Sequence, residues 1–151
     1  MKTEQKGYIS QDGLWRICAK LYINGEVHSD KIEFIIDSGS EITILSPDLA
    51  EDIGIRFETL STKNEMDIGN SCDCNARELP GIDIILDPVD DDDPLTLCKM
   101  YLPDPERWKR KDYSLIGQDV LRQFNITSDN KHKTITLTYV GDLTAYIQRK
   151  C

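Results

Sequence analysis

The sequence predicts an all-β fold, a small closed β-barrel or β-sandwich with one or two short helices. Several short segments alternate between apolar and polar residues, as strands that bury one face do. Turn-forming Gly, Pro and Asn residues separate these segments. The chain has 151 residues, 39% of them hydrophobic, which suits one core. We find no repeat or linker and expect one domain over residues 1–151, with the flanking segments 1–11 and 140–151 left unassigned.

Five segments rich in branched and aromatic residues are predicted as strands. The first two form a hairpin, because Asn24-Gly25 between them tolerates the positive φ angles of a tight turn. The second strand of this hairpin leads directly into Asp37. In chain order, the five segments are residues 14–23, 31–36, 82–86, 95–102 and 133–139.

Two short helices are predicted. Residues 46–54 have Ser46 as an N-cap, Pro47 at the first helical position and Gly54 as a C-cap. Residues 118–124 form the second helix, directly after a glycine. Neither helix is long enough to change the prediction of a β fold.

The composition argues against several kinds of partner. The formal net charge is −9, which disfavours nucleic acid, because phosphate binding needs a positive field. No apolar run approaches the roughly 18 residues of a membrane span, and the N-terminus lacks the apolar core of a signal peptide. We therefore expect no membrane partner. Five cysteines without regular spacing fit reduced thiols, so we expect a cytoplasmic protein.

No metal site or cofactor is predicted. Cys72-Asp73-Cys74 is at most half of a tetrahedral site. The histidines, His28 and His132, lie far away in the sequence and lack the spacing of metal ligands.

Two charged stretches are interpreted as solvent-exposed. Residues 90–93 are four acids between two prolines; calcium binding is the alternative, but the run lacks the spacing and the glycine of a calcium loop. Around Trp108 stand four basic residues within residues 107–111, which we interpret as an exposed connection rather than a binding patch.

The stretch FIIDSGSEITIL, residues 34–45, contains the strongest candidate for a functional site. Its first three residues are apolar on both faces, so we expect a buried strand that delivers Asp37 to an interior cleft. Ser38 and Gly39 allow a tight turn in which backbone N–H groups face the Asp37 carboxylate. Such a carboxylate is suited to acid–base chemistry. The alternative is an Asx-type turn in which Asp37 only caps its own loop.

Residues 34–45 resemble the active-site signature of the retropepsin-like (retroviral-type) aspartic proteases. That signature has apolar residues, Asp, Ser or Thr, Gly, a small residue, often an acid, and alternating apolar positions. Residues 115–121 (LIGQDVL) are similar to the family's second conserved segment, which opens the helix behind the catalytic loop. Residues 67–71 (DIGNS) are similar to the tip of the mobile hairpin, or flap, that closes over the substrate. The resemblance covers residues 12–139 in the correct order.

The resemblance implies an aspartic endopeptidase of the retropepsin fold that acts on extended peptides or unfolded protein. Two carboxylates activate one water in that chemistry, one as the base and the other as the acid. The signature occurs once in 151 residues. The resemblance therefore implies a homodimer in which each subunit contributes Asp37.

The resemblance also implies roles for other residues. Catalysis falls to Asp37, and the loop that holds it would be supported by Ser38, Gly39, Gly117 and Asp119. The substrate would be bound by the remaining residues, which belong to the loop or to the flap: Gly39, Ser40, Glu41, Ile68, Gly69 and Asn70.

Three features depart from the family pattern. Gln118 stands where viral members usually have Arg, so it cannot pair with the charge of Glu41, and we expect a weaker brace between loop and helix. The stretch between the two signatures is also longer, mainly through residues 90–108. After Asp119 the chain continues to Cys151, whereas viral members end sooner. Gln118 and this altered C-terminal region motivate an alternative function, a catalytically silent retropepsin-fold module for peptide binding or dimerisation. A further alternative is an unrelated small β domain with a structural Asp37.

Overall fold

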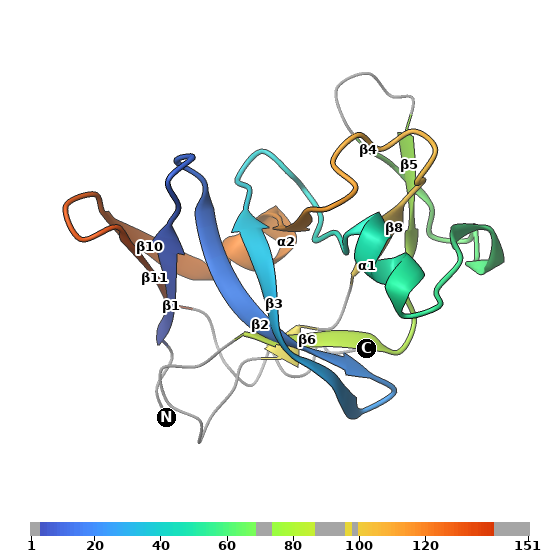
Figure 1. The fold of residues 1–151 in the computed structure, drawn as a ribbon, viewed down its shortest axis with the longest axis horizontal. Coiled ribbons are helices and arrows are strands. Elements are labelled where there is room, and N and C mark those ends of the chain that lie inside the picture. The colour runs from blue at the N-terminus through green and yellow to red at the C-terminus, as the bar shows by residue number, and fades with distance from the viewer. Residues whose placement is uncertain (1–3, 69–73, 87–95, 98–99, 141–151) are drawn as a thin grey trace.

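The computed structural model describes residues 4–68, 74–86, 96–97 and 100–140, and two sheets account for its strands (Figure 1). The larger, eight-stranded sheet has the order β10-β11-β1-β2-β3-β9, with β6 on β2 and β7 on β6. The smaller sheet has the order β4-β5-β8. The strands of the larger sheet are β1 (Glu4–Ile9), β2 (Trp15–Ile23), β3 (Glu26–Ile36), β6 (Ile82–Leu86), β7 (Thr96–Leu97), β9 (Ser114–Ile116), β10 (Phe124–Asp129) and β11 (Thr134–Tyr139). Those of the smaller sheet are β4 (Met66–Ile68), β5 (Cys74–Glu78) and β8 (Tyr101–Pro103).

The β2–β3 hairpin is the centre of the larger sheet. Its predicted turn is confirmed, since Asn24 and Gly25 have φ angles of 51° and 84°. One edge of β2 pairs with β3, and its other edge is divided between β1 and β6. Because two partners share one edge, the sheet curls, and Figure 1 shows β6 crossing the lower half of the hairpin. The all-β prediction is confirmed.

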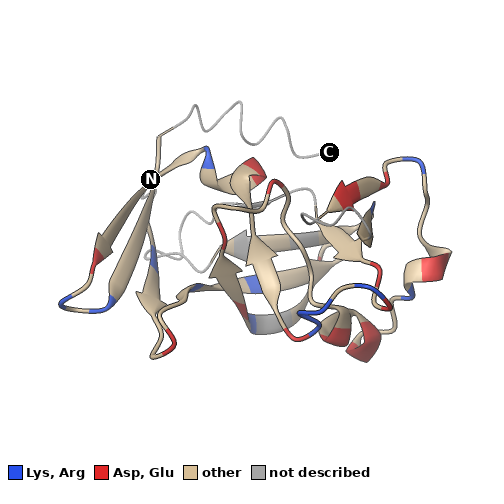
Figure 2. Ribbon diagram, turned by 90° about the horizontal axis from the view of Figure 1, so that it is seen from above, with Lys and Arg blue, Asp and Glu red and all other residues tan. Residues whose placement is uncertain are grey.

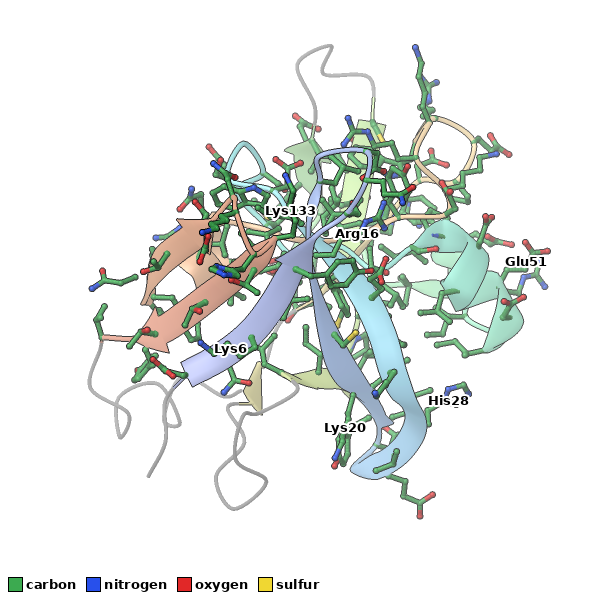
Figure 3. All side chains as sticks on the ribbon, turned by 60° about the vertical axis from the view of Figure 1, so that its left-hand side comes forward. Lys6, Arg16, Lys20, His28, Glu51 and Lys133 are labelled. Atoms are coloured by element: carbon green, nitrogen blue, oxygen red, sulfur yellow. The ribbon has the colours of Figure 1, made fainter. Side chains whose placement is uncertain are left out.

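The Arg16 side chain on the larger sheet is paired with two carboxylates. Arg16 on β2 forms ion pairs with Asp12 and Glu33 at 3.0 and 2.7 Å (Figure 3). Its guanidinium carbon also lies 5.9 Å from the centre of the Tyr113 ring. These contacts connect the β1–β2 turn, β3 and the segment before β9.

Both helices start where the sequence predicts and end earlier. Helix α1 (Pro47–Asp52) begins after Ser46, whose hydroxyl accepts the Leu49 N–H at 3.1 Å, so the predicted N-cap is confirmed. Ile53, and not Gly54, is its C-cap. Helix α2 (Gln118–Leu121) is one turn long, because β10 starts at Phe124. A 3₁₀ turn, η1 (Phe57–Thr59), follows α1.

One predicted strand is wrong as a single element. Within residues 95–102 the structure has two strands: β7 belongs to the larger sheet, and β8 lies in the smaller sheet. Five further strands were not predicted: β4, β5 and β9, and the two strands that flank β11, which are β1 and β10. Both are rich in polar residues and pair with β11, so their partner, and not their own pattern, makes them strands.

Two groups of buried apolar side chains form the core. The first fills the curl of the larger sheet and includes Phe34, Leu21 and Leu137, each with no exposed surface. The second, here the site cluster, lies between the smaller sheet and β9. Its members are Ile35, Ile42, Ile44, Ile68, Cys74, Ala76, Tyr101 and Leu115. In the described part of the chain, no helix is long and apolar enough to span a membrane.

Candidate active site

Asp37 stands at the end of β3, where the backbone is fixed by a neighbouring strand. β3 and β9 run parallel, with Ile36 beside Ile116. The ladder continues by one bond, because the Asp37 N–H donates to the Ile116 carbonyl at 2.9 Å. The Asp-Ser-Gly motif therefore lies next to the start of the second signature, which is 78 residues later in the sequence.

The loop after β3 turns around the Asp37 carboxylate. Asp37 Oδ1 accepts the Gly39 N–H at 3.0 Å, and the Ser40 N–H donates to the Asp37 carbonyl at 3.2 Å. The Asp37 side chain is half-buried, while Ser38 and Gly39 are exposed. The bond expected of an Asx-type turn is thus present, and it leaves the second carboxylate oxygen free for other partners.

Asp119 braces the loop from behind. Its two carboxylate oxygens accept the Thr43 N–H at 3.1 Å and the Thr43 hydroxyl at 2.8 Å. The Gly117 N–H in turn donates to the Thr43 hydroxyl oxygen at 3.3 Å. Gly117 and Asp119, predicted as supports of the loop, therefore contact the strand segment that follows it.

Gln118 contacts the Asp37 loop through the backbone of that loop and not through the charge of Glu41. The Gln118 side chain donates from Nε2 to the Ser38 carbonyl at 2.9 Å. Two backbone bonds add to it, from Gln118 N–H to the Ser40 carbonyl at 2.7 Å and from Asp119 N–H to the Glu41 carbonyl at 3.1 Å. Three hydrogen bonds therefore join Gln118 and Asp119 to the backbone of the Asp37 loop.

Burial raises the pKa of Asp119 above its ordinary value, although the bonds from Thr43 and Val120 oppose the shift. Because its pKa is raised, Asp119 remains protonated in the folded protein at pH values at which the same residue is already ionised in the unfolded chain. The stability that it contributes is therefore greatest below the unfolded pKa and falls as the pH rises through the folded pKa.

The Asp119→Asn variant tests this brace. We expect it to lower the free energy of unfolding by about 1–3 kcal/mol, because the amide nitrogen that replaces one carboxyl oxygen cannot accept a bond from Thr43, whereas the hydroxyl oxygen of a protonated carboxyl still can. The loss should be largest at acidic pH and shrink toward neutral pH, because the wild type loses the Asp119 contribution on ionisation. Urea denaturation of both proteins across this range measures it. A loss that grows with pH contradicts the assignment.

A cavity of about 520 Å³ opens beside Asp37. Five predicted site residues line it: Asp37, Gly39, Ser40, Glu41 and Ile68. Its floor belongs to the site cluster, which also contributes Ile42, Ile44 and Leu115. Ser38, Gly117 and Asp119 do not line the cavity, and Gly69 and Asn70 lie outside the described residues. No group of three or more His, Cys, Asp or Glu side chains placed to hold a metal ion occurs among the described residues.

The four remaining lining residues were not assigned to the site by the sequence analysis, although Asp67 belongs to the segment that is similar to the flap tip. Met66 and Asp67 come from β4, and Trp108 and Arg110 come from the segment before β9. The interpretation of Trp108 as part of an exposed connection is wrong, because its side chain is half-buried and packs against the site cluster. A single tryptophan among four cations was the available signal, since exposed connections seldom need a large apolar side chain.

The fold and this loop can be compared with known proteins. A family model described as aspartyl protease matches residues 19–75, which include the Asp37 loop and β4. The crystal structure of a retropepsin-like aspartic protease from Rickettsia conorii matches 92% of this chain and 93% of that chain, with a TM-score of 0.56 and 21% sequence identity. The chain has a retropepsin-like fold.

The retropepsin-like resemblance stated from the sequence is thereby confirmed. No curated protein matches the sequence. The family model ends at residue 75, before Gly117 and Asp119. In this retropepsin-like chain, the second signature is therefore placed by the structural match and by its own hydrogen bonds to the loop.

Proposed function

We propose that the protein is an aspartic endopeptidase of the cytoplasm that works as a homodimer and cuts extended peptides or unfolded protein. The observation that carries this proposal is the Asp37 carboxylate, held on a braced loop at the wall of a cavity of about 520 Å³. That volume falls in the range of sites that bind ligands the size of a short peptide segment. The family match to aspartyl proteases supports it.

The chemistry requires a second carboxylate. Two carboxylates in contact cannot both be charged, so the pair shares one proton. The charged member takes a proton from a water between them, the water attacks the peptide carbonyl, and the protonated member polarises that carbonyl. The leaving amine is then protonated, and no covalent intermediate forms. The Asp-Ser-Gly motif occurs once in the sequence, so the partner carboxylate is the Asp37 of a second subunit.

Features of the loop and flap support this assembly. Ser38 and Gly39 are exposed in the single chain, which leaves the loop tip accessible to a partner loop. β4 and β5 pair antiparallel beside the cavity, with Asp67 opposite Asn75 and Ile68 opposite Cys74. Ile68 and Asp67 line the cavity from this hairpin. A hairpin in that position would cover a bound peptide and exclude water during hydrolysis.

A subunit-mixing experiment tests the dimeric dyad. Wild-type protein is unfolded and refolded together with an equal amount of the Asp37→Asn variant. Random pairing leaves about half of the wild-type subunits in intact dimers, so hydrolysis of an unfolded test protein should fall to about one half. A ninefold excess of the variant should reduce it to about one tenth.

The control for mixing is the same Asp37→Asn protein added after separate refolding and assayed before subunits exchange. This control measures competition for substrate alone. Activity that is unchanged by co-refolding would mean that one chain is a complete enzyme. Absence of hydrolysis in the wild type would remove the protease proposal itself.

A further inference from the structure

A concentrated positive charge borders the cavity of this acidic protein. The basic loop, defined as residues 107–111, carries Arg107, Lys109, Arg110 and Lys111, all of them exposed. Residues 109–111 are the one run of three basic residues in the sequence, whose net charge is −9. They form the longest blue stretch of ribbon in Figure 2. This cluster of cations creates a local positive field, opposite in sign to the net charge of the chain.

The backbone of the basic loop is fixed at both ends. At its start, the Trp108 N–H donates to the Asp104 carbonyl at 2.9 Å. At its end, the Lys111 carbonyl accepts the Ser46 hydroxyl at 2.7 Å and the Asp48 N–H at 3.0 Å. Between them, the Trp108 side chain packs on the site cluster. The cations are therefore presented from a rigid support.

Within the described residues, the four cations of the basic loop have no ion-pair partner. Arg16, Arg56 and Arg77 each have a carboxylate within 3.0 Å. By contrast, no side chain of the basic loop has an ion pair within 4.0 Å among the described residues. The neighbouring acid Asp104 uses its Oδ1 to accept the Glu106 N–H at 3.0 Å. No carboxylate in the described part of the chain therefore neutralises the charge of this loop.

The cavity itself is polarised. Asp37, Glu41 and Asp67 line it with negative charge, and Arg110 is the cation among its described lining residues. An acidic side chain would be repelled by the three carboxylates and attracted by Arg110 and the rest of the basic loop. A peptide that carries acids on one side of the cleaved bond therefore binds in one direction, with its acids toward this loop.

We propose that the basic loop binds an acidic segment of the peptide that occupies the cavity. This inference rests on the proposed function, because it assigns a substrate class to the same site. The basic loop would give the site a preference for acidic peptides and would fix the direction in which the peptide lies. Because the interacting charges are exposed, the attraction between the loop and the peptide is modest and weakens as the salt concentration rises.

The test uses the Asp37→Asn protein, so that binding is measured without cleavage. Two fluorescein-labelled twelve-residue peptides serve as probes; they are identical except that four Glu in one are four Gln in the other. Fluorescence anisotropy should show about tenfold tighter binding of the Glu peptide at low salt. The preference should shrink at about 0.5 M salt, where the screening length is only a few ångströms.

Charge reversals locate the effect. Arg110→Glu and Lys109→Glu, each added to Asp37→Asn, should abolish the preference for the Glu peptide. The matched control is Lys131→Glu, which changes the net charge equally but lies in the exposed turn between β10 and β11. It should keep the preference. Equal binding of both peptides, or an equal loss in the control, overturns the proposal.

Two further outcomes are decisive. Displacement of the Glu peptide by a short single-stranded oligonucleotide at lower concentration than by unlabelled Glu peptide would overturn the assignment to an acidic peptide. If wild-type protein binds the Glu peptide selectively and cuts nothing, the protease proposal fails while the role of the basic loop stands.

Discussion

Replacement of Asp37 by Asn should reduce peptide hydrolysis by at least about a thousandfold, since it removes both the base and the shared proton of the dyad. The fold should survive, because an Asn Oδ1 can still accept the Gly39 N–H that Asp37 Oδ1 accepts at 3.0 Å. Cleavage of an unfolded test protein, followed by gel electrophoresis and mass spectrometry, measures the loss.

The matched control for this variant is Asp52→Asn, which makes the same chemical change at an exposed position at the end of α1, outside the cavity lining and the basic loop. It should retain wild-type activity. Wild-type hydrolysis should also have a bell-shaped pH profile with an acidic optimum, since the pair must carry one proton. Hydrolysis that persists in pure Asp37→Asn protein would exclude Asp37 as the catalytic group.

Replacement of Gly117 by Ala should destabilise the protein by about 3 kcal/mol or more. A Cβ at this position would lie 2.7 Å from the carbonyl carbon of Ile42 and 2.8 Å from the carbonyl oxygen of Ser40. Both neighbours are backbone atoms of the braced loop, so neither can rotate away. The φ and ψ angles of Gly117, −103° and −171°, suit any residue, and the cost is therefore one of space.

A second glycine variant distinguishes the cost of a steric clash from the cost of backbone strain. Gly13 has a φ of 83° and open space around its Cα, so Gly13→Ala should cost only about 1 kcal/mol. Urea denaturation of the two variants gives the comparison. If Gly117→Ala is as stable as Gly13→Ala, the segment of Ser40 to Ile42 is not held against Gly117 as tightly as the structure has it.

The parts of this protein that could be predicted from sequence carry their signals locally. Asn24-Gly25 specifies its turn by backbone freedom alone, and Ser46 specifies the start of α1 through one hydroxyl. The Asp37 loop was found because its short motif is distinctive and a second motif follows in the right order. Each of these signals lies within a few residues.

The parts that escaped prediction depend on distant neighbours. Residues 4–9 have no clear alternation, yet they form β1 because β2 and β11 offer free edges on both sides. Residues 95–102 look like one strand, but the chain passes from one sheet to the other within them. Trp108 lines the cavity only because residues 104–111 pass over the site cluster. The positions of these residues depend on packing partners that are distant in the sequence, so a local sequence pattern does not reveal them.

The parallel pairing of β3 with β9 has a consequence for the order of events during synthesis. The contacts that hold the Asp37 loop come from residues 116–119, more than 70 positions later in the chain. A growing polypeptide that has emerged only as far as β8 contains the Asp37 loop but not residues 116–119, which support it. Long-range closure of this kind is slow to form. The cleft can therefore be assembled only after most of the chain has left the ribosome, which delays its chemistry until the rest of the molecule can fold around it.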